Sequence, residues 1–216
     1  MSPVLVWRFD RPWLAISSAP LGGGLGERQW VINMTVPTGY QRLDPEVHLA
    51  EVAAGLGLRG PGVGLLTAVD VREVVHESDG GVQVSVTTGL GGYPTWAAAP
   101  EQRHMWSIRG IERNEWATCG PSEPGHRAGT INAVCWLPVR LSDAALVNAV
   151  ATVAEAKAQA MFEAGVPGTG TCTDATVLLC PTTGPAEQFG GPRSAIGAPL
   201  ARAVHAAVAA GLRGSA

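Results

Sequence analysis

The chain has 216 residues, of which 28 are glycine and 16 are proline, and so many turn-forming residues exclude a coiled coil or a simple helical bundle. Hydrophobic residues make up 46% and charged residues 15% of the sequence. This composition excludes an intrinsically disordered chain and predicts one packed domain, residues 1–216. The net charge is −3 and the arginines are scattered, so we expect neither nucleic acid nor a membrane surface as a partner.

The N-terminal segment and the cysteines bear on the compartment. Arg8 and Asp10 interrupt the apolar run near the N-terminus, a pattern that fits neither a signal peptide nor a membrane span, and we expect a cytoplasmic protein. The four cysteines follow no zinc-ribbon or Cys-x-x-Cys spacing and stand at Cys119, Cys135, Cys172 and Cys180. We therefore expect free thiols and no metal site.

Strand and helix patterns alternate along the chain without a long linker. In chain order the sequence predicts strands at 4–9, 12–17 and 29–36, a helix at 45–55, strands at 63–67, 69–76, 82–88 and 130–136, a helix at 143–164, a strand at 175–180 and a helix from about 199 to 211. Strands outnumber helices in an irregular order. This favours an α+β fold, a mixed or antiparallel sheet covered by a few helices, with an α/β sandwich as the alternative. Residues 89–128 predict a lid-like or irregular excursion.

Small polar residues gather beside glycine at the predicted strand ends. Glycine lets backbone amides approach a ligand closely, and hydroxyl and amide side chains form short neutral hydrogen bonds. The same residues also suit local hydrogen bonds within turns. As a surface that binds amides or phosphates we predict Asn33, Thr87, Thr88, Gly89, Gly129, Thr130, Gly168, Thr169, Gly170 and Thr173.

One lysine stands among fourteen arginines, at Lys157. It falls on the apolar stripe of the helix at 143–164, among Leu146, Val153 and Ala160. An ammonium in such a stripe must either extend to solvent or meet a buried acceptor. We expect it to pair with Asp174, which ends the Gly-Thr-rich turn after this helix.

Seven segments occur in a characteristic order: SSAPLGGGL, INMTVP, LLTAVDV, VTTGLGG, GTINAVCWLPVRLSDAALVNAVATVAEAKAQAM, GTGTCTDATVLL and SAIGAPLARAVHAAV. With them the chain resembles the adenosylcobinamide amidohydrolase family, the CbiZ type, from about residue 15 to 210, and the resemblance is most specific at GTIN, EAK and GTGTCTD. It implies hydrolysis of the amide between the aminopropanol arm and the corrin of adenosylcobinamide, giving adenosylcobyric acid in corrinoid salvage. The cobalt corrinoid would then be the substrate, with no separate cofactor.

Amide hydrolysis needs an activated water or nucleophile, donors for the oxyanion and an acid for the leaving amine. We expect backbone amides of residues 168–171, helped by Asn33 or Asn132, to bind the oxyanion. Asp174 or Glu155 would activate the water, and Lys157 would stabilise negative charge or protonate the amine. In a covalent variant, Thr130 or Thr171 attacks with Lys157 as its base.

Two other classes of function remain open in the sequence. A corrinoid carrier or sensor without catalysis would use the same polar clusters, and a metal-dependent hydrolase would combine Asp174 and Glu155 with a histidine. Trp96, Trp106 or Trp116 are candidates to cover a corrin or adenosyl face. A homo-oligomer is also compatible with the sequence.

Overall fold

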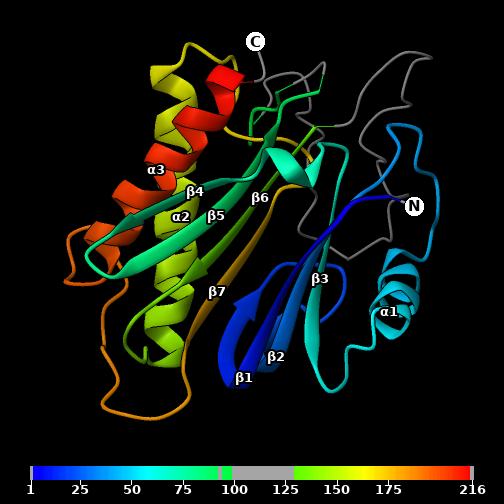
Figure 1. Ribbon diagram of the computed structural model, residues 1–216. Coiled ribbons are helices and arrows are strands. Elements are labelled where there is room, and N and C mark those ends of the chain that lie inside the picture. The colour runs from blue at the N-terminus through cyan, green and yellow to red at the C-terminus, as the bar shows by residue number, and fades with distance from the viewer. Residues whose placement is uncertain (1, 92–93, 99–128, 215–216) are drawn as a thin grey trace, which may run out of the picture.

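The computed structural model describes residues 2–91, 94–98 and 129–214 (Figure 1). The strands are β1 (Val4–Ser17), β2 (Gly24–Thr35), β3 (Gly62–Thr67), β4 (Val75–Asp79), β5 (Val82–Gly89), β6 (Thr130–Trp136) and β7 (Ala175–Pro181). The helices are α1 (Pro45–Gly55), α2 (Asp143–Glu163) and α3 (Gly197–Gly214), with a 3-10 turn at Val71–Glu73. This confirms the predicted α+β class with a mixed sheet. None of the helices in these residues is long and apolar enough to cross a membrane.

The strands of the described residues form one sheet in the order β3-β2-β1-β7-β6-β5-β4. The pairs β2 with β3 and β6 with β7 are parallel, and the other neighbours are antiparallel. Strand β1 joins the two halves of the sheet, because it pairs with both β2 and β7. Strand β3 contacts β6 although three strands separate them in the sheet, so the sheet folds over and its two halves face each other.

The folded sheet produces four layers with three hydrophobic cores. Helices α2 and α3 lie side by side over the half that contains β4, β5, β6 and β7, and α1 lies on the far side, beside β3 (Figure 1). Alternate residues of β5, Val82, Val84 and Val86, pack toward the α2 and α3 layer. Alternate residues of β2 pack with Leu49 of α1. Alternate residues of both strands therefore face a hydrophobic core, as expected of strands with one apolar side.

Three predicted strand boundaries need correction. Residues 4–9 and 12–17 form one strand, β1, whose register shifts between Arg8 and Trp13, since Pro12 cannot donate to a ladder. Residues 69–76 are not one strand, because the Asp70 carboxylate accepts the Arg72 N–H (3.0 Å) and caps the 3-10 turn, and β4 begins only at Val75. Strand β2 begins at residue 24 instead of 29.

Helix α2 begins and ends as predicted, whereas the end of α3 differs from the prediction. The Ser142 hydroxyl accepts the Ala145 N–H (3.2 Å) at the start of α2, and Gly165, with φ of +72°, follows its end as predicted. Helix α3 instead continues past Gly211. A Cβ at Gly211 would overlap the side chain of Thr88, so this glycine serves the close packing of α3 on β5 and is not a stop signal.

Candidate active site

The predicted pairing of Lys157 with Asp174 is confirmed: the two side chains form an ion pair between Nζ and Oδ2. Only 18% of the Lys157 side chain and 13% of the Asp174 side chain are exposed. Lys157 lies on the side of α2 that faces the sheet, where Val153 and Ala160 are buried. A partly buried ammonium needs such a partner, because removing a charge from water without compensation is costly.

The groups around Asp174 donate hydrogen bonds to its carboxylate. Its Oδ1 accepts from the Ile131 N–H (2.8 Å) and from the Thr171 hydroxyl (2.5 Å). Its Oδ2 accepts from the Thr171 N–H (3.0 Å) and from Lys157. The carboxylate is thereby held in one orientation and joins α2, β6 and the turn before β7. A hydroxyl, a carboxylate and an ammonium lie in contact, which is a set suited to nucleophilic or acid and base chemistry.

Gly170 leaves the space that this ion pair occupies. A Cβ at this position would overlap both Asp174 Oδ2 and Lys157 Nζ. We expect Gly170→Ala to displace the pair and to reduce turnover on the order of 10²-fold, as small misplacements of reacting groups do. Steady-state kinetics measure this. The matched control is Gly55→Ala, where a Cβ meets nothing within 4 Å, and full activity in Gly170→Ala would contradict the assignment.

The backbone amides of the turn before Asp174 do not all meet the expectation for oxyanion donors. The N–H of Gly168 donates to Val166 O (2.9 Å) and that of Thr169 to Thr95 O (2.9 Å), while that of Thr171 donates to Asp174. These three amides therefore already have acceptors within the chain, so they would have to exchange them to bind an oxyanion. Within the described residues, the N–H of Gly170 has no acceptor.

The neighbouring segment 94–98 covers this turn. Thr95 N–H donates to Gly170 O (2.7 Å), and Ala97 N–H donates to the Thr169 hydroxyl (3.1 Å). Trp96 is 50% exposed, whereas Trp106 and Trp116 lie outside the described residues. Most of the predicted excursion at 89–128 lies outside them as well.

Thr130 and Thr173 lie together beside the Asp174 turn. Their hydroxyls contact each other (2.7 Å), and both donate to Gly129 O, at 2.8 and 3.0 Å. A Cβ at Gly129 would overlap the backbone of Leu90. Both threonines thus make local hydrogen bonds within the chain, which is the alternative to ligand binding that the sequence left open. The Thr130 hydroxyl contacts Gly129 O and Thr173, and not Lys157 or Asp174.

Asn33, Thr87 and Asn132 form a separate polar ladder between the two halves of the sheet. Asn33 Nδ2 donates to Thr87 Oγ1 (3.1 Å), and Asn132 Nδ2 donates to Asn33 Oδ1 (3.1 Å) and to Leu66 O (2.9 Å). Each of the three side chains is at most 2% exposed. Along β6, Asn132 faces this interior while Ile131 and Ala133 face the α2 and α3 layer, where Lys157 lies. The structure therefore does not bring the ladder and the Lys157 pair together.

Loss of the ladder should mainly affect stability. Asn132→Ala leaves Asn33 Oδ1 and Leu66 O buried without their donor, which we expect to lower the unfolding free energy by about 1–3 kcal/mol. Urea unfolding followed by circular dichroism measures this. An unchanged midpoint, or a loss of turnover in a fully stable variant, would instead assign Asn132 a direct role.

Glu155 is not part of the cluster around Asp174. Its side chain is exposed on α2, about 200° around the helix from Lys157. The geometry thus gives Asp174, and not Glu155, the position beside the hydroxyl and the ammonium. Among the described residues, no hydrogen bond or ion pair of Glu155 supports its predicted role in water activation, which stays a prediction.

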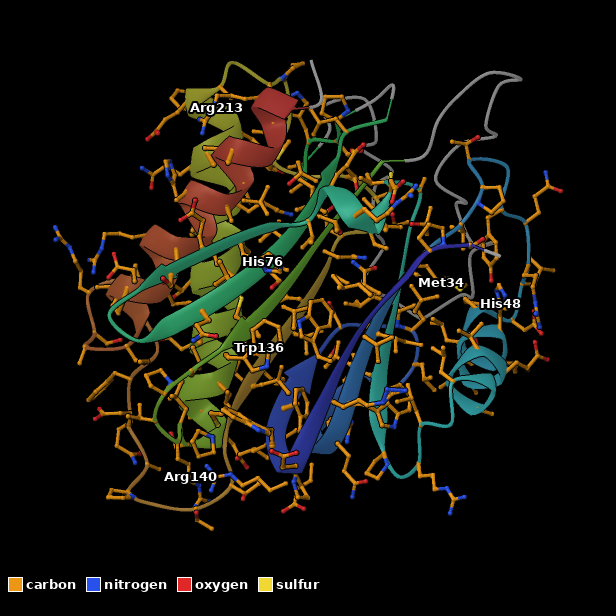
Figure 2. The ribbon with its side chains drawn as sticks, viewed as in Figure 1. Met34, His48, His76, Trp136, Arg140 and Arg213 are labelled. Carbon is orange, nitrogen blue, oxygen red and sulfur yellow. The ribbon has the colours of Figure 1, made fainter. Side chains whose placement is uncertain are left out.

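A large pocket lies next to this cluster. It measures about 1070 Å³ and is bounded by the end of β5, the 68–73 segment and the C-terminal parts of α2 and α3. Of the predicted binding residues, Thr88 and Gly89 line it. Sequence reasoning missed the other lining residues, among them Ala164, His205 and Arg213, because only the packing of α2 beside α3 brings them together. Figure 2 shows Arg213 at the end of α3 that borders the pocket.

The cysteines and acidic residues give little support for a thiol or metal mechanism. Cys135 and Cys180 are free, and burial raises the pKa of both thiols, which makes them unreactive. Cys172 is disulfide-bonded, so the expectation of free thiols is wrong for this residue. Among the residues that the structure describes, no three His, Cys, Asp or Glu side chains gather into a metal-binding group, so Asp174 and Glu155 do not meet a histidine there.

Comparison with known proteins places this chain in a family. The family model described as adenosylcobinamide amidohydrolase matches residues 1–215. An adenosylcobinamide amidohydrolase of Methanosarcina mazei is 28% identical over 204 residues, which covers 90% of this chain and 88% of the relative. One of Halobacterium salinarum is 29% identical over 203 residues, covering 93% of this chain and 79% of the relative. The protein is therefore an enzyme of the amidohydrolase class. The chain belongs to the adenosylcobinamide amidohydrolase family.

Proposed function

We propose that the protein hydrolyses the amide that joins the aminopropanol arm to the corrin of adenosylcobinamide. The products are aminopropanol and adenosylcobyric acid, in a salvage route that returns incomplete corrinoids to cobalamin biosynthesis. The observation that carries this proposal is the contact of Lys157, Asp174 and Thr171. These residues lie in the EAK and GTGTCTD segments on which the family resemblance is most specific. The cobalt belongs to the substrate, and the reaction calls for no resident cofactor.

In the water mechanism, Asp174 accepts a proton from a water molecule that attacks the amide carbon. The N–H of Gly170 is the available donor of its turn for the oxyanion. The C–N bond then breaks, and Lys157 gives a proton to the leaving nitrogen and regains one from Asp174 through their ion pair. The products are a carboxylic acid and a free amine, so the atoms of one water molecule are accounted for.

In the covalent mechanism, the Thr171 hydroxyl oxygen attacks the amide carbon first. The C–N bond breaks, aminopropanol leaves with a proton from Lys157, and the corrin carboxyl group stays on Thr171 as an ester. Its hydroxyl already donates to Asp174 (2.5 Å), which would receive the proton. Thr130 is the weaker nucleophile candidate, because its hydroxyl donates to Gly129 O instead. Water then hydrolyses the ester and frees Thr171.

Thr171→Val separates the two mechanisms. If Thr171 is the nucleophile, the variant is expected to lose all measurable turnover, and quenched wild-type enzyme should carry the mass of a corrinoid acyl group. If water attacks directly, the variant keeps part of its activity and no acyl enzyme forms. Intact-protein mass spectrometry and steady-state rates measure the two outcomes, with Thr171→Ser as the variant that retains a hydroxyl.

The activity itself is tested by incubating the purified protein with adenosylcobinamide. We expect mass spectrometry to detect aminopropanol and adenosylcobyric acid in equal amounts. Binding of the corrinoid without release of aminopropanol would contradict hydrolysis and favour the carrier or sensor function. Activity that disappears with a chelator and returns with an added metal ion would instead support the metal-dependent hydrolase.

A further inference from the structure

The pocket of about 1070 Å³ beside the Lys157 cluster has the size of a site for a large ligand. Pockets for drug-sized molecules measure about 300–1,000 Å³, so this one exceeds what a small amide substrate requires. A corrin with its peripheral amide arms is a broad disc of the size that such a volume accommodates. The pocket is therefore large enough for an occupant bigger than the aminopropanol arm that is cut.

One wall of the pocket is built from small and apolar side chains. Helix α2 contributes Ala160, its C-cap residue is Ala164, and helix α3 contributes Ala209 and Leu212. Three of these four residues are alanines, whose short side chains leave open the space that larger side chains would fill between the helix ends. A low apolar wall suits the face of a large ring, which gains from burial without directional contacts.

Charged side chains also line the pocket. Three carboxylates, from Asp70, Glu73 and Glu163, line the pocket together with a single guanidinium, that of Arg213. The hydrogen bonds from Gln159 and His205 hold the pKa of Glu163 below its usual range, and Arg72 lowers the pKa of Asp70 to about 2. The carboxylates of Glu163 and Asp70 are therefore ionised at neutral pH. They suit a ligand with a positive charge and with primary amides that donate hydrogen bonds.

The pocket and the cluster lie within one helical turn of each other. Ala160 on the pocket wall follows Lys157 by three residues on α2, a rise of about 4.5 Å. On the other side, Gly89 lines the pocket and pairs with Thr130 in the β5 and β6 register. An amide arm at the edge of a ring in the pocket can thus reach the Lys157 and Asp174 side chains.

We propose that this pocket holds the corrin disc of the substrate, with the alanine wall against a ring face and the carboxylates toward the peripheral amides and the cationic metal centre. This inference rests on the proposed function, since it assigns the place of that substrate. It also moves the binding surface from the buried Asn33 and Asn132 to residues of α2, α3 and the 68–73 segment.

The test places a large side chain in the pocket by substituting an exposed residue that lines it. Ala164→Trp projects a large ring into it, and Ala154→Trp is the matched control, because Ala154 is also exposed on α2 but does not line the pocket. Both are made in the Lys157→Arg background, so that bound substrate is consumed only slowly, and Ala209→Trp replaces Ala164→Trp if the latter does not fold. Equilibrium dialysis with adenosylcobinamide, read by the absorbance of the corrin, gives Kd, and wild-type hydrolysis is measured separately by aminopropanol release.

We expect Ala164→Trp to raise Kd about tenfold or more, the equivalent of about 1.4 kcal/mol, and Ala154→Trp to leave it unchanged. Equal affinity in both variants would overturn the pocket assignment, while aminopropanol release by the wild type would still support the function. Weakened binding in Ala164→Trp combined with no release by the wild type would support the pocket and contradict hydrolysis. No binding by any of the proteins would overturn both.

Discussion

Lys157→Arg is expected to reduce turnover of adenosylcobinamide by about 10²-fold or more while leaving its Kd unchanged. Arginine keeps the positive charge and can still pair with Asp174, so the fold and the corrinoid site remain intact. A guanidinium does not release a proton at neutral pH, however, and cannot protonate the leaving amine. Steady-state kinetics and equilibrium dialysis measure the two quantities.

The control for this variant is Arg202→Lys. Arg202 lies near the start of α3 and forms an exposed ion pair with Asp79. Arg202→Lys thus replaces an arginine with a lysine, the reverse of Lys157→Arg, at a position without a proposed catalytic role. We expect wild-type turnover there, because exposed ion pairs contribute little. If Lys157→Arg lost binding and turnover equally, or lost neither, the catalytic assignment of Lys157 would be wrong.

Asp174→Asn is expected to reduce turnover by about 10²–10⁴-fold, the range for removal of a general base. The amide keeps the shape of the side chain, but it cannot accept a proton from water or from Thr171. It also leaves Lys157 without its counter-charge. Breaking a fully buried pair costs about 3–5 kcal/mol, and because this pair is partly exposed we expect a smaller loss of unfolding free energy, seen as a lower Tm.

Glu155→Gln is the comparison that separates the two acidic candidates. Glu155 is exposed and makes no contact with the Asp174 cluster, so we expect it to keep wild-type turnover and Tm. A loss of turnover in Glu155→Gln with retention in Asp174→Asn would show that the water is activated from the exposed side of α2 and would contradict the geometry described above.

Local patterns predicted the elements and one side-chain pair. The alternation of apolar and polar residues in β2 and β5 defined which face is buried, because the period of a strand is fixed by its backbone. Lys157 could be found because a lysine in an apolar stripe requires an acceptor, and Asp174 is the first carboxylate that follows this helix in the sequence. These inferences needed only contacts that follow from helix and strand geometry.

Features that the sequence did not predict depend on contacts between distant segments. Asn33 and Asn132 were grouped with the catalytic residues because they are polar, but the sheet folds at β1 and buries both between its halves. The sequence predicted that Gly211 ends a helix, whereas in the structure this glycine allows α3 to pack closely against Thr88. The pocket likewise arises from the packing of α2 beside α3, and no single segment carries a signal for it.

A crystal structure of Asp174→Asn with adenosylcobinamide bound tests the central claim most directly, since the inactive variant preserves the substrate. We expect the corrin between the ends of α2 and α3, with the carbonyl of the scissile amide near Gly170 N–H and its nitrogen within hydrogen-bond distance of Lys157. A scissile amide bound away from both residues, whether at the Asn33 and Asn132 ladder or elsewhere on the surface, would contradict the account.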